Sequence, residues 1–464
     1  MRPPGSRLRR CLLILGLLGI AAALVGGWFV VRQLFPNLFD REHVDAAEVN
    51  KLAEVDLSQT RERSAEAKDW PQFRGPLRDG WSPGTDFRTN WQDAPPTVVW
   101  SKPCGGGYSS VAVVDGKLYT MDRDGGNERV RCLNAADGAD LWIHEYPVDY
   151  GSLKTGYAAG PRATPTIHKN MLYAVGATGQ MIALRLPATP GEKPTVAWQR
   201  DLVDEYDAAV PTWGVACSPL VEGNLVIVQP GGPRGSVVAF DRTTGEPRWT
   251  CGTEPSGYSS PVAATLGGVR QIVAITGQSV QGINTDTGGL LWKHEWVTQH
   301  NGNIAMPVVV GDYVFVSSGY HKGCAALRIE VDKAKLVYFR PDKVMRNHHS
   351  TCVHKDGFVY GFDDSKLACV NLRDGTVVKD WPPEEVRNRV SKGSVALVGD
   401  SLLALTERGS LVLTNTDPKS FHLLGRLDNV LAGSECWAQP AVVNGKIYVR
   451  DATKIVCLDS SIIR

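Results

Sequence analysis

The sequence predicts an all-β fold in which eight four-stranded antiparallel sheets close into a ring, a β-propeller, after an N-terminal transmembrane helix. Three observations predict it. Apolar, alternating runs with a turn at their centre recur eight times, their turns are 43 to 54 residues apart, and Gly and Trp are abundant, with 48 and 13 copies in 464 residues. Short strands joined by tight turns give such runs. A repeat period near 45 residues is typical of propeller blades.

The overall charge excludes one class of partner. Lys and Arg total 50 and Asp and Glu total 49, so the chain lacks the basic excess of a dedicated nucleic-acid binder. Apolar residues make up 43% of the chain, which is enough for a folded core. We therefore expect a globular protein with no nucleic-acid partner.

The N-terminal sequence predicts a membrane anchor. Four arginines in the basic segment 1–10 precede an uncharged stretch over 11–31, which as a helix would span about 31 Å and match a bilayer core. The arginines predict a cytoplasmic N-terminus, so the rest of the chain lies on the extracytoplasmic, periplasmic side of the inner membrane. A signal peptide cleaved near Ala21–Ala23 is the alternative.

The next segment, residues 32–69, is charged and poor in β-branched residues, and it predicts a partly helical stalk or linker. Residues 70–464 carry the propeller. The chain has ten cysteines and no C-x-x-C motif. Buried free thiols and one or two disulfides both remain open for these cysteines.

The repeats set the architecture of residues 70–464. The hairpin turns are centred on Gly116, Asn170, Gly223, Gly268, Asp312, Gly357, Asp400 and Gly445. A third and a fourth strand follow each hairpin, and the fourth often carries an aromatic residue: Trp100, Trp142, Trp198, Trp249, Trp292, Phe339 or Trp381. Such units must stack face to face to bury their sheets. The last unit supplies three strands, so we expect residues 97–102 to pair with it and close the ring.

One repeat carries a specific motif. Ala239, Asp241, Thr244, Gly245 and Trp249 spell A-x-D-x-x-T-G-x-x-x-W, and partial copies lie around Trp142, Trp292 and Cys369. The motif resembles the tryptophan-docking repeat of pyrroloquinoline-quinone (PQQ) propellers, a family that includes quinoprotein alcohol dehydrogenases and the eight-bladed lipoprotein scaffold of the outer-membrane β-barrel assembly machinery. The resemblance covers roughly residues 70–464. It implies that each Trp packs between neighbouring blades.

The segments that lead into the innermost strands predict a binding site, because they meet at one mouth of a propeller channel. Their candidate ligand-binding side chains are Tyr108, Arg162, Trp213, Tyr258, Asn303, His348, His349, Lys392 and Trp437. The aromatic rings offer stacking surfaces, and Arg162 and Lys392 suit an anionic group. A planar acid such as PQQ, a sugar or a peptide end would fit. The alternative is that these side chains only cap strands or fill the channel.

The resemblance to the dehydrogenases implies PQQ in the central funnel, a Ca²⁺ ion, an Asp base and usually a disulfide of adjacent cysteines. This chain has no Cys-Cys pair, and its acidic run around Asp204 lies in a connection. The leading hypothesis is therefore a membrane-anchored, non-catalytic scaffold without catalytic residue, metal or cofactor, which binds an unknown protein or a small planar or anionic ligand. A divergent PQQ- and Ca²⁺-dependent alcohol or sugar oxidoreductase and an outer-membrane protein assembly factor are the alternatives.

Overall fold

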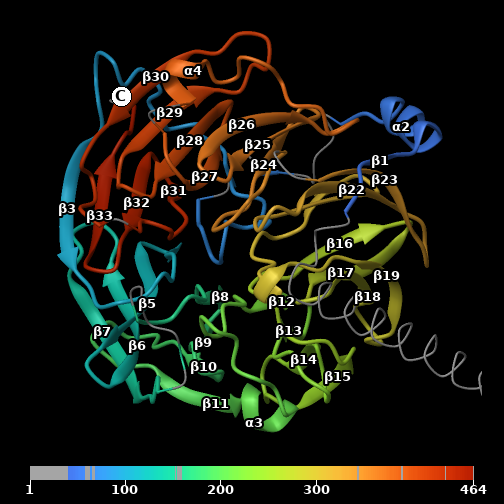
Figure 1. The fold of residues 1–464 in the computed structure, drawn as a ribbon. Helices are drawn as coiled ribbons and strands as arrows, with labels where there is room; N and C mark the ends of the chain where they lie inside the picture. The colour runs from blue at the N-terminus through green and yellow to red at the C-terminus, as the bar shows by residue number, and fades with distance from the viewer. Residues whose placement is uncertain are drawn as a thin grey trace, which may run out of the picture.

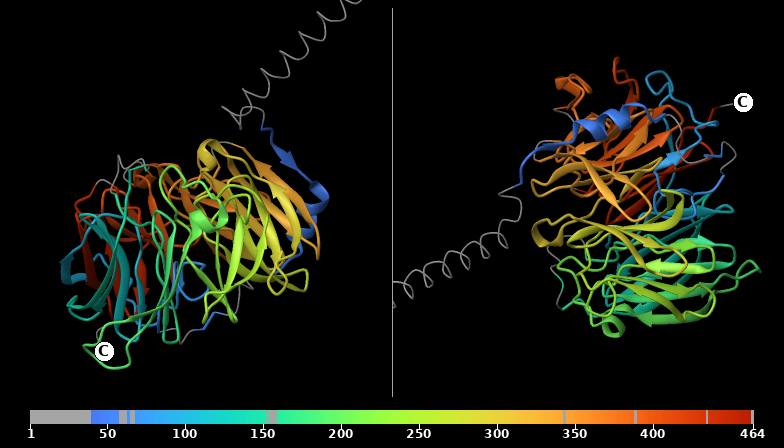
Figure 2. Two further views of the ribbon diagram at one scale, coloured as in Figure 1. Left: turned by 90° about the horizontal axis from the view of Figure 1, so that it is seen from below. Right: turned by 90° about the vertical axis from the view of Figure 1, so that its right-hand side faces the viewer.

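The computed structural model shows eight small sheets, or blades, in a ring around a central axis (Figure 1). It describes residues 40–57, 63–64, 68–151, 153, 159–341, 344–387, 390–433 and 435–462. Seen from the side, the ring is a thick disc (Figure 2). The first strands of neighbouring repeats contact one another near the axis. The prediction of an all-β propeller with eight blades is confirmed.

Blades 1 to 4 each consist of four antiparallel strands that follow one another outward from the axis. Blade 1 holds β4 (Ala112–Val114), β5 (Lys117–Asp124), β6 (Asn127–Asn134) and β7 (Asp140–Pro147). Blade 2 holds β8 (Thr166–His168), β9 (Met171–Val175), β10 (Gln180–Arg185) and β11 (Thr195–Asp201), followed by helix α3 (Leu202–Tyr206). Blade 3 holds β12 (Leu220–Glu222), β13 (Leu225–Val228), β14 (Val237–Asp241) and β15 (Pro247–Cys251). Blade 4 holds β16 (Val262–Leu266), β17 (Val269–Ile275), β18 (Ser279–Asn284) and β19 (Leu290–Glu295), followed by the 3₁₀ turn η1 (Gln299–Asn301).

Blades 5 to 8 vary in their edge strands. Blade 5 holds β20 (Val308–Val310), β21 (Tyr313–Ser318), β22 (Gly323–Ile329) and β23 (Ala334–Arg340), with β1 (His43–Val44) added outside β23. Blade 6 holds β24 (Val353–Lys355), β25 (Phe358–Asp363) and β26 (Lys366–Asn371), with an isolated bridge between Val370 and Val377 in the fourth position. Blade 7 follows helix α4 (Glu384–Arg387) and holds β27 (Gly393–Val398), β28 (Ser401–Thr406), β29 (Leu411–Asn415) and β30 (Leu423–Leu427), with β2 (Trp81–Ser82) parallel to β27. Blade 8 holds β31 (Ala441–Val443), β32 (Lys446–Arg450), β33 (Lys454–Asp459) and β3 (Thr97–Pro103).

Blade 8 closes the ring with both ends of the propeller. Its outer strand β3 pairs antiparallel with β33, so that Thr97 lies opposite Asp459 and Pro103 lies opposite Lys454. An unpaired edge at either strand would expose a row of backbone donors and acceptors. The pairing therefore fixes the circumference of the ring, which in turn fixes the distance between side chains that face the axis.

Tryptophans dock neighbouring blades together, as the repeat motif implies. The indole Nε1 of Trp249 donates to the carbonyl of Thr285 at 2.9 Å. A Cβ atom on Gly288, whose φ is +71°, would lie 2.6 Å from the same indole, so only glycine fits there. The same contact recurs where Trp100 meets Gly138 and where Trp198 meets Gly245.

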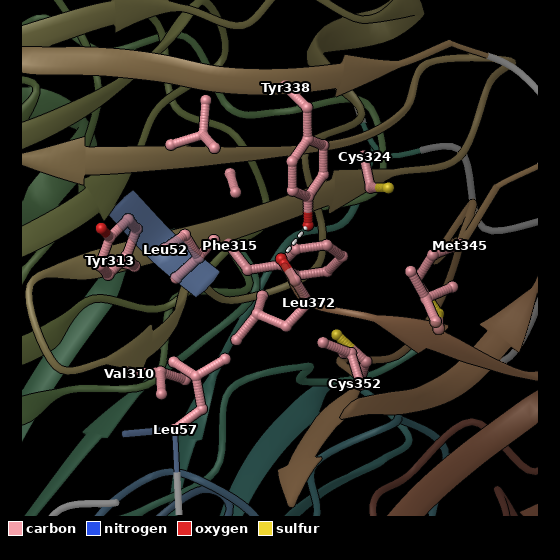
Figure 3. Packing of buried hydrophobic residues seen from close by; sticks show 14 of the residues in the cluster. Leu52, Leu57, Val310, Tyr313, Phe315, Cys324, Tyr338, Met345, Cys352 and Leu372 are labelled. Atoms are coloured by element: carbon pink, nitrogen blue, oxygen red, sulfur yellow. Dashed lines mark hydrogen bonds between the residues drawn. The ribbon is translucent and has the colours of Figure 1, made fainter. Parts of the chain in front are cut away.

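At the junction of blades 5 and 6 the docking residue is Tyr338 and not Phe339, the residue that the spacing predicts. The Tyr338 hydroxyl donates to the carbonyl of Leu372 at 2.9 Å (Figure 3). The ring of Tyr338 packs on Gly375. The ring of Phe339 instead packs edge-on against Trp296, at 5.8 Å between centroids. Successive residues of a strand face opposite sides of the sheet, so a prediction that is wrong by one residue places the aromatic ring on the wrong face.

The predicted stalk needs correction, because its described part is docked on the propeller. Strand β1 extends blade 5, and α2 (Ala46–Ala53) follows it, with the Asp45 side chain capping its first turn. Leu52 and Leu57 are fully buried in the core between blades 5 and 6 (Figure 3). Charge and low β-propensity had indicated a solvated linker, whereas two well-placed leucines are enough to dock it.

The predicted transmembrane helix, residues 11–31, lies outside the described residues. Within the described part of the chain, no helix has the length and apolarity needed to cross a bilayer. The nine cysteines in this part are all free thiols, and eight of them are buried. Burial raises the pKa of Cys352 to about 12, which keeps it protonated and unreactive.

Side-chain hydroxyls join the inner strands to one another. The backbone N–H of Ser110 in blade 1 donates to Oγ1 of Thr164 in blade 2 at 3.1 Å. The N–H of Thr164 donates to Ser218 in blade 3 at 3.0 Å. The N–H of Ser218 donates to Ser260 in blade 4 at 2.9 Å. The N–H of Gln439 in blade 8 returns to Ser110 at 2.7 Å. These bonds satisfy inner-strand donors across the blade boundaries.

The segment that follows the stalk fills one end of the channel. Arg74 is buried and donates to the carbonyls of Thr351 at 3.0 Å and Cys352 at 2.9 Å in blade 6. Arg78 is also buried and donates to the carbonyl of Ser218 in blade 3 at 2.9 Å. The segment therefore ties opposite sides of the ring together, and it leaves the other end of the channel as the open one.

Replacing Leu52 with Ala tests the docking of α2. Loss of a fully buried leucine costs about 2–5 kcal/mol, so we expect a lower midpoint of thermal unfolding and faster proteolysis within residues 40–57. The matched control is Leu290→Ala, because Leu290 is 50% exposed on a blade edge and its loss changes stability by about 0.5 kcal/mol or less. Equal behaviour of the two variants would show that α2 is not held by its apolar face.

Candidate functional site

A cavity of about 300 Å³ lies at the open end of the channel, where the segments leading into the inner strands converge. Eight of the nine predicted residues line it: Tyr108, Arg162, Trp213, Tyr258, His348, His349, Lys392 and Trp437. The cavity is also lined by Ser110, Ser218 and Ser260, whose hydroxyls join the inner strands of neighbouring blades. Phe73, from the segment that fills the other end, also lines it. The ring closure thus brings residues from distant repeats to one place.

Asn303 is the exception among the predicted residues. Its side chain is fully buried and donates to the carbonyls of Thr276 and Trp296, both at 2.9 Å. Its Oδ1 accepts from Ser318 at 3.0 Å. The amide therefore holds the loop of blade 5 in place and does not reach the cavity, and the neighbouring Ile304 lines the cavity instead.

Aromatic rings form a continuous belt on one side of the mouth. Tyr108 packs against Trp437 with 5.0 Å between ring centroids. Trp437 stacks on His349 at 4.0 Å with an interplanar angle of 10°. The rings of His349 and His348 are 3.9 Å apart, and Tyr320 meets His348 edge-on at 4.8 Å. Blades 1, 8, 6 and 5 contribute to this belt, so its flat faces depend on the ring geometry.

The belt continues across blades 3 and 4. His300 bridges Tyr320 at 6.0 Å and Trp213 at 5.8 Å. Trp213 in turn packs against Tyr258 at 5.5 Å between ring centroids. Aromatic pairs at these separations attract one another beyond simple burial, which holds the rings in place before anything binds.

Two cations at the mouth have different surroundings. The Nζ of Lys392 is 3.1 Å from a carboxylate oxygen of Asp364, which compensates its charge. The Arg162 guanidinium lies over the ring of Tyr108 at 5.5 Å, and Nη1 donates to the carbonyl of Gly160. Within the described residues no carboxylate pairs with Arg162, and burial lowers the pKa of this guanidinium.

The histidine next to Lys392 is neutral at physiological pH. Burial lowers the pKa of His348 to about 4, and the charge of Lys392 adds to the effect. The Nζ of Lys392 lies 3.2 Å from Nδ1 of His348 and donates to it, so the imidazole hydrogen resides on Nε2. Within the described residues Nε2 has no hydrogen-bond partner. The same holds for the hydroxyl of Ser350, which is 4% exposed and lines the cavity.

Three lining residues come from segments other than those leading into the inner strands, so the sequence prediction did not consider them. Tyr320 lies in the turn between β21 and β22, and Glu407 lies in the turn after β28. Phe73 comes from the segment that fills the channel. The signal that could have found the first two is positional, because the turn between the second and third strands of a blade lies at the same mouth as the start of its inner strand.

The donor set does not suit a calcium ion. Ca²⁺ takes about six to eight oxygen ligands with several carboxylates. Glu407 lines the cavity and accepts from the indole of Trp437 at 3.5 Å, while Asp364 faces Lys392. Within the described residues no three His, Cys, Asp or Glu side chains are placed to hold a metal ion together. The cavity therefore offers flat aromatic walls and one guanidinium, without a set of metal ligands among the described residues.

The fold and this funnel define an eight-bladed propeller of the PQQ-like repeat class. The family model described as "Outer membrane protein assembly factor BamB" matches residues 126–381, just over half of the chain. The chain therefore belongs to that family. The match ends before blades 7 and 8, which the structure supplies.

Solved structures share the fold. BamB from Moraxella catarrhalis is 14% identical, with a TM-score of 0.54 over 78% of this chain and 97% of that chain. A quinohemoprotein alcohol dehydrogenase from Comamonas testosteroni is 13% identical, with a TM-score of 0.61 over 90% of this chain and 84% of that chain. At these identities the likeness shows the fold alone. No curated protein matches the sequence.

The neutral state of His348 predicts a pH effect on stability. The unfolded imidazole takes up a proton below about pH 6.5, whereas the folded one does so only near pH 4. The unfolded state thus binds more protons between these values, and stability falls as the pH falls through this window. We expect the thermal midpoint of His348→Asn to drop less between pH 7 and pH 4.5 than that of the wild type. Parallel curves would contradict the assignment.

Proposed function

We propose that this protein is a non-catalytic binding propeller whose aromatic funnel holds a group presented by a partner protein. The observation that carries the proposal is the convergence of rings from separate blades, with Arg162 beside them, on one open cavity. Concave, mainly apolar sites with few polar groups are typical ligand sites, and Trp, Tyr and Arg dominate protein-binding hot spots. Membership of the BamB family supports protein binding in general.

The geometry favours binding over catalysis. The rings are held by one another and by the inner strands, so they are ordered before a partner arrives and little entropy is lost on binding. Three polar groups at the mouth can donate to a ligand: the Arg162 guanidinium, Nε2 of His348 and the Ser350 hydroxyl. Such a set suits the recognition of an acceptor group on a partner.

Photo-crosslinking tests the proposal. A benzoylphenylalanine at Tyr320 keeps an aromatic ring at the mouth, and we expect it to crosslink to a discrete partner in intact membranes. The matched control is the same probe at Val196, which is 46% exposed on the outer strand of blade 2. Crosslinks from the probe at Val196 alone, or none from the probe at Tyr320, would contradict the proposal that the funnel is the binding surface.

The second candidate is a role in outer membrane protein assembly, which the description of the matching family favours. Recovery of barrel-assembly components in the Tyr320 crosslink would support it. The third candidate, a PQQ-dependent alcohol or sugar oxidoreductase, requires metal ligands that the described residues of the mouth do not offer. Dye reduction after loading with PQQ and Ca²⁺ would favour it over both binding roles.

We further propose that residues 11–31 anchor the protein in the cytoplasmic membrane, with the propeller outside and its funnel facing the bilayer. Asp40 pairs with Lys322 at 2.8 Å, and Lys322 shares a turn with Tyr320 at the mouth. The eight residues 32–39 span at most about 28 Å when extended, so the mouth lies within that reach of the anchor.

Fluorescence quenching in proteoliposomes measures this orientation. A bimane on His321→Cys, in the mouth-side turn of blade 5, should be quenched by spin-labelled lipid more strongly than one on Asp332→Cys, in the opposite turn of the same blade. The buried native thiols label slowly, which limits background. Stronger quenching at the Asp332→Cys position would contradict the proposed orientation. Release of the protein from the membrane by alkaline carbonate would contradict the proposed anchor.

A further inference from the structure

The Arg162 guanidinium is unusual among the arginines that face the channel. Arg74 and Arg78 each donate to several backbone carbonyls with both terminal nitrogens. Arg162 has a single hydrogen bond from Nη1, to Gly160, and within the described residues it has no carboxylate partner. Arg162 is partly buried, and holding a charge partly away from water without a counter-charge is unfavourable. A charge kept in that state beside a cavity indicates that its partner comes from outside.

Independent observations place further unmet donors at the same cavity. The hydroxyl of Ser350 lines the cavity, is 4% exposed and has no hydrogen-bond partner within the described residues. Nε2 of His348 is a second donor without a partner there. Buried polar groups are almost always paired in native structures. These donors lie on blade 6 and Arg162 lies on blade 2, so the cavity offers donors on two of its sides to the acceptors of a ligand.

The flat walls restrict the rest of the ligand. Trp437, Tyr108, Trp213 and Tyr258 present ring faces or edges around the cavity. A volume near 300 Å³ is at the lower end of ligand pockets, so it holds one ring system and not an extended chain. The charge of Lys392 is already met by Asp364, whereas Arg162 has no carboxylate within salt-bridge distance among the described residues. A ligand with a single negative charge therefore fits better than a phosphate or a polyacid.

We propose that the funnel binds an aromatic group that bears one carboxylate, with the carboxylate on Arg162 and the ring between the aromatic walls. The inference rests on the proposed function and specifies the group that the partner presents: the C-terminal aromatic residue of a polypeptide. A free aromatic acid offers the same chemistry. Arginine pairs with carboxylates through two parallel hydrogen bonds, which gives orientation as well as affinity. Glu407 lies on blade 7, whereas Arg162 lies on blade 2, so the cavity is polarised to orient such a ligand.

Isothermal titration of the full chain in detergent tests the inference. The probes are the peptide acetyl-Gly-Ser-Gly-Trp with a free carboxylate, its C-terminal amide, the same peptide ending in Ala, and indole-3-propionate. We expect the free acid to bind about tenfold to a hundredfold more tightly than the amide, because the amide leaves Arg162 unpaired. Replacing the terminal Trp with Ala should weaken binding by a similar factor, because the walls lose their stacking partner.

Variants locate the carboxylate. Arg162→Met keeps the packing over Tyr108, and we expect it to weaken the acid to the level of the amide while leaving the amide unchanged. Arg162→Lys should restore part of the difference, because lysine keeps the charge and loses the bidentate geometry. The matched control is Arg248→Met on the exposed edge of blade 3, which should bind as the wild type does. Equal thermal midpoints of the variants exclude misfolding.

Each outcome decides the inference. Tighter binding of the peptide acid than of indole-3-propionate supports a polypeptide end, and equal or tighter binding of indole-3-propionate supports a small aromatic acid. Equal affinity for acid and amide, or binding of none of the probes, overturns the inference. In that case a positive crosslink from Tyr320 would still uphold the proposed function, so the two failures are distinguishable.

Discussion

The closed ring of inner strands is the constraint on which the rest of the structure depends. Backbone donors of one blade meet hydroxyls of the next, from Gln439 through Ser110, Thr164 and Ser218 to Ser260. Each bond is modest, yet a missing partner would leave a buried N–H unsatisfied, which is far more unfavourable. These bonds thus hold blade 8 and blades 1 to 4 at one radius, and the pairing of β3 with β33 closes the ring. Every distance across the mouth is set by that radius.

The N-terminal segment reinforces this frame from inside. Arg74 and Arg78 are buried, and burial lowers the pKa of each guanidinium to about 10, so both remain charged at neutral pH. Their donors end on carbonyls of blades 6 and 3, on opposite sides of the channel. Charged hydrogen bonds to carbonyls are about twice as strong as neutral ones. The segment therefore links blades 3 and 6 across the channel. Phe73, which belongs to the same segment, lines the cavity.

Sequence periodicity predicts this architecture well because each blade repeats one local pattern, and the same reasoning finds Tyr108, Trp213 and Trp437 at the funnel mouth. It fails where long-range packing overrides local character. Leu52 reads as part of a charged linker but is buried against blade 5. Asn303 stands at an equivalent position but turns inward, because the carbonyls of neighbouring loops need its amide. Neither fact is encoded in spacing, since both depend on which loops the ring brings together.

The contrast among the channel arginines links architecture to function. A propeller that needed only a filled channel would satisfy each buried guanidinium with carbonyls, as it does for Arg74 and Arg78. At the open mouth the same fold has neutralised Lys392 with Asp364, so it can supply an acid where one is needed. Arg162 nevertheless has no carboxylate within salt-bridge distance among the described residues, and it contacts the ring of Tyr108 and the carbonyl of Gly160. A guanidinium held in this way inside a rigid aromatic frame would stabilise a bound anion more than it stabilises the fold, and the proposed binding site at this end of the channel rests on that contrast.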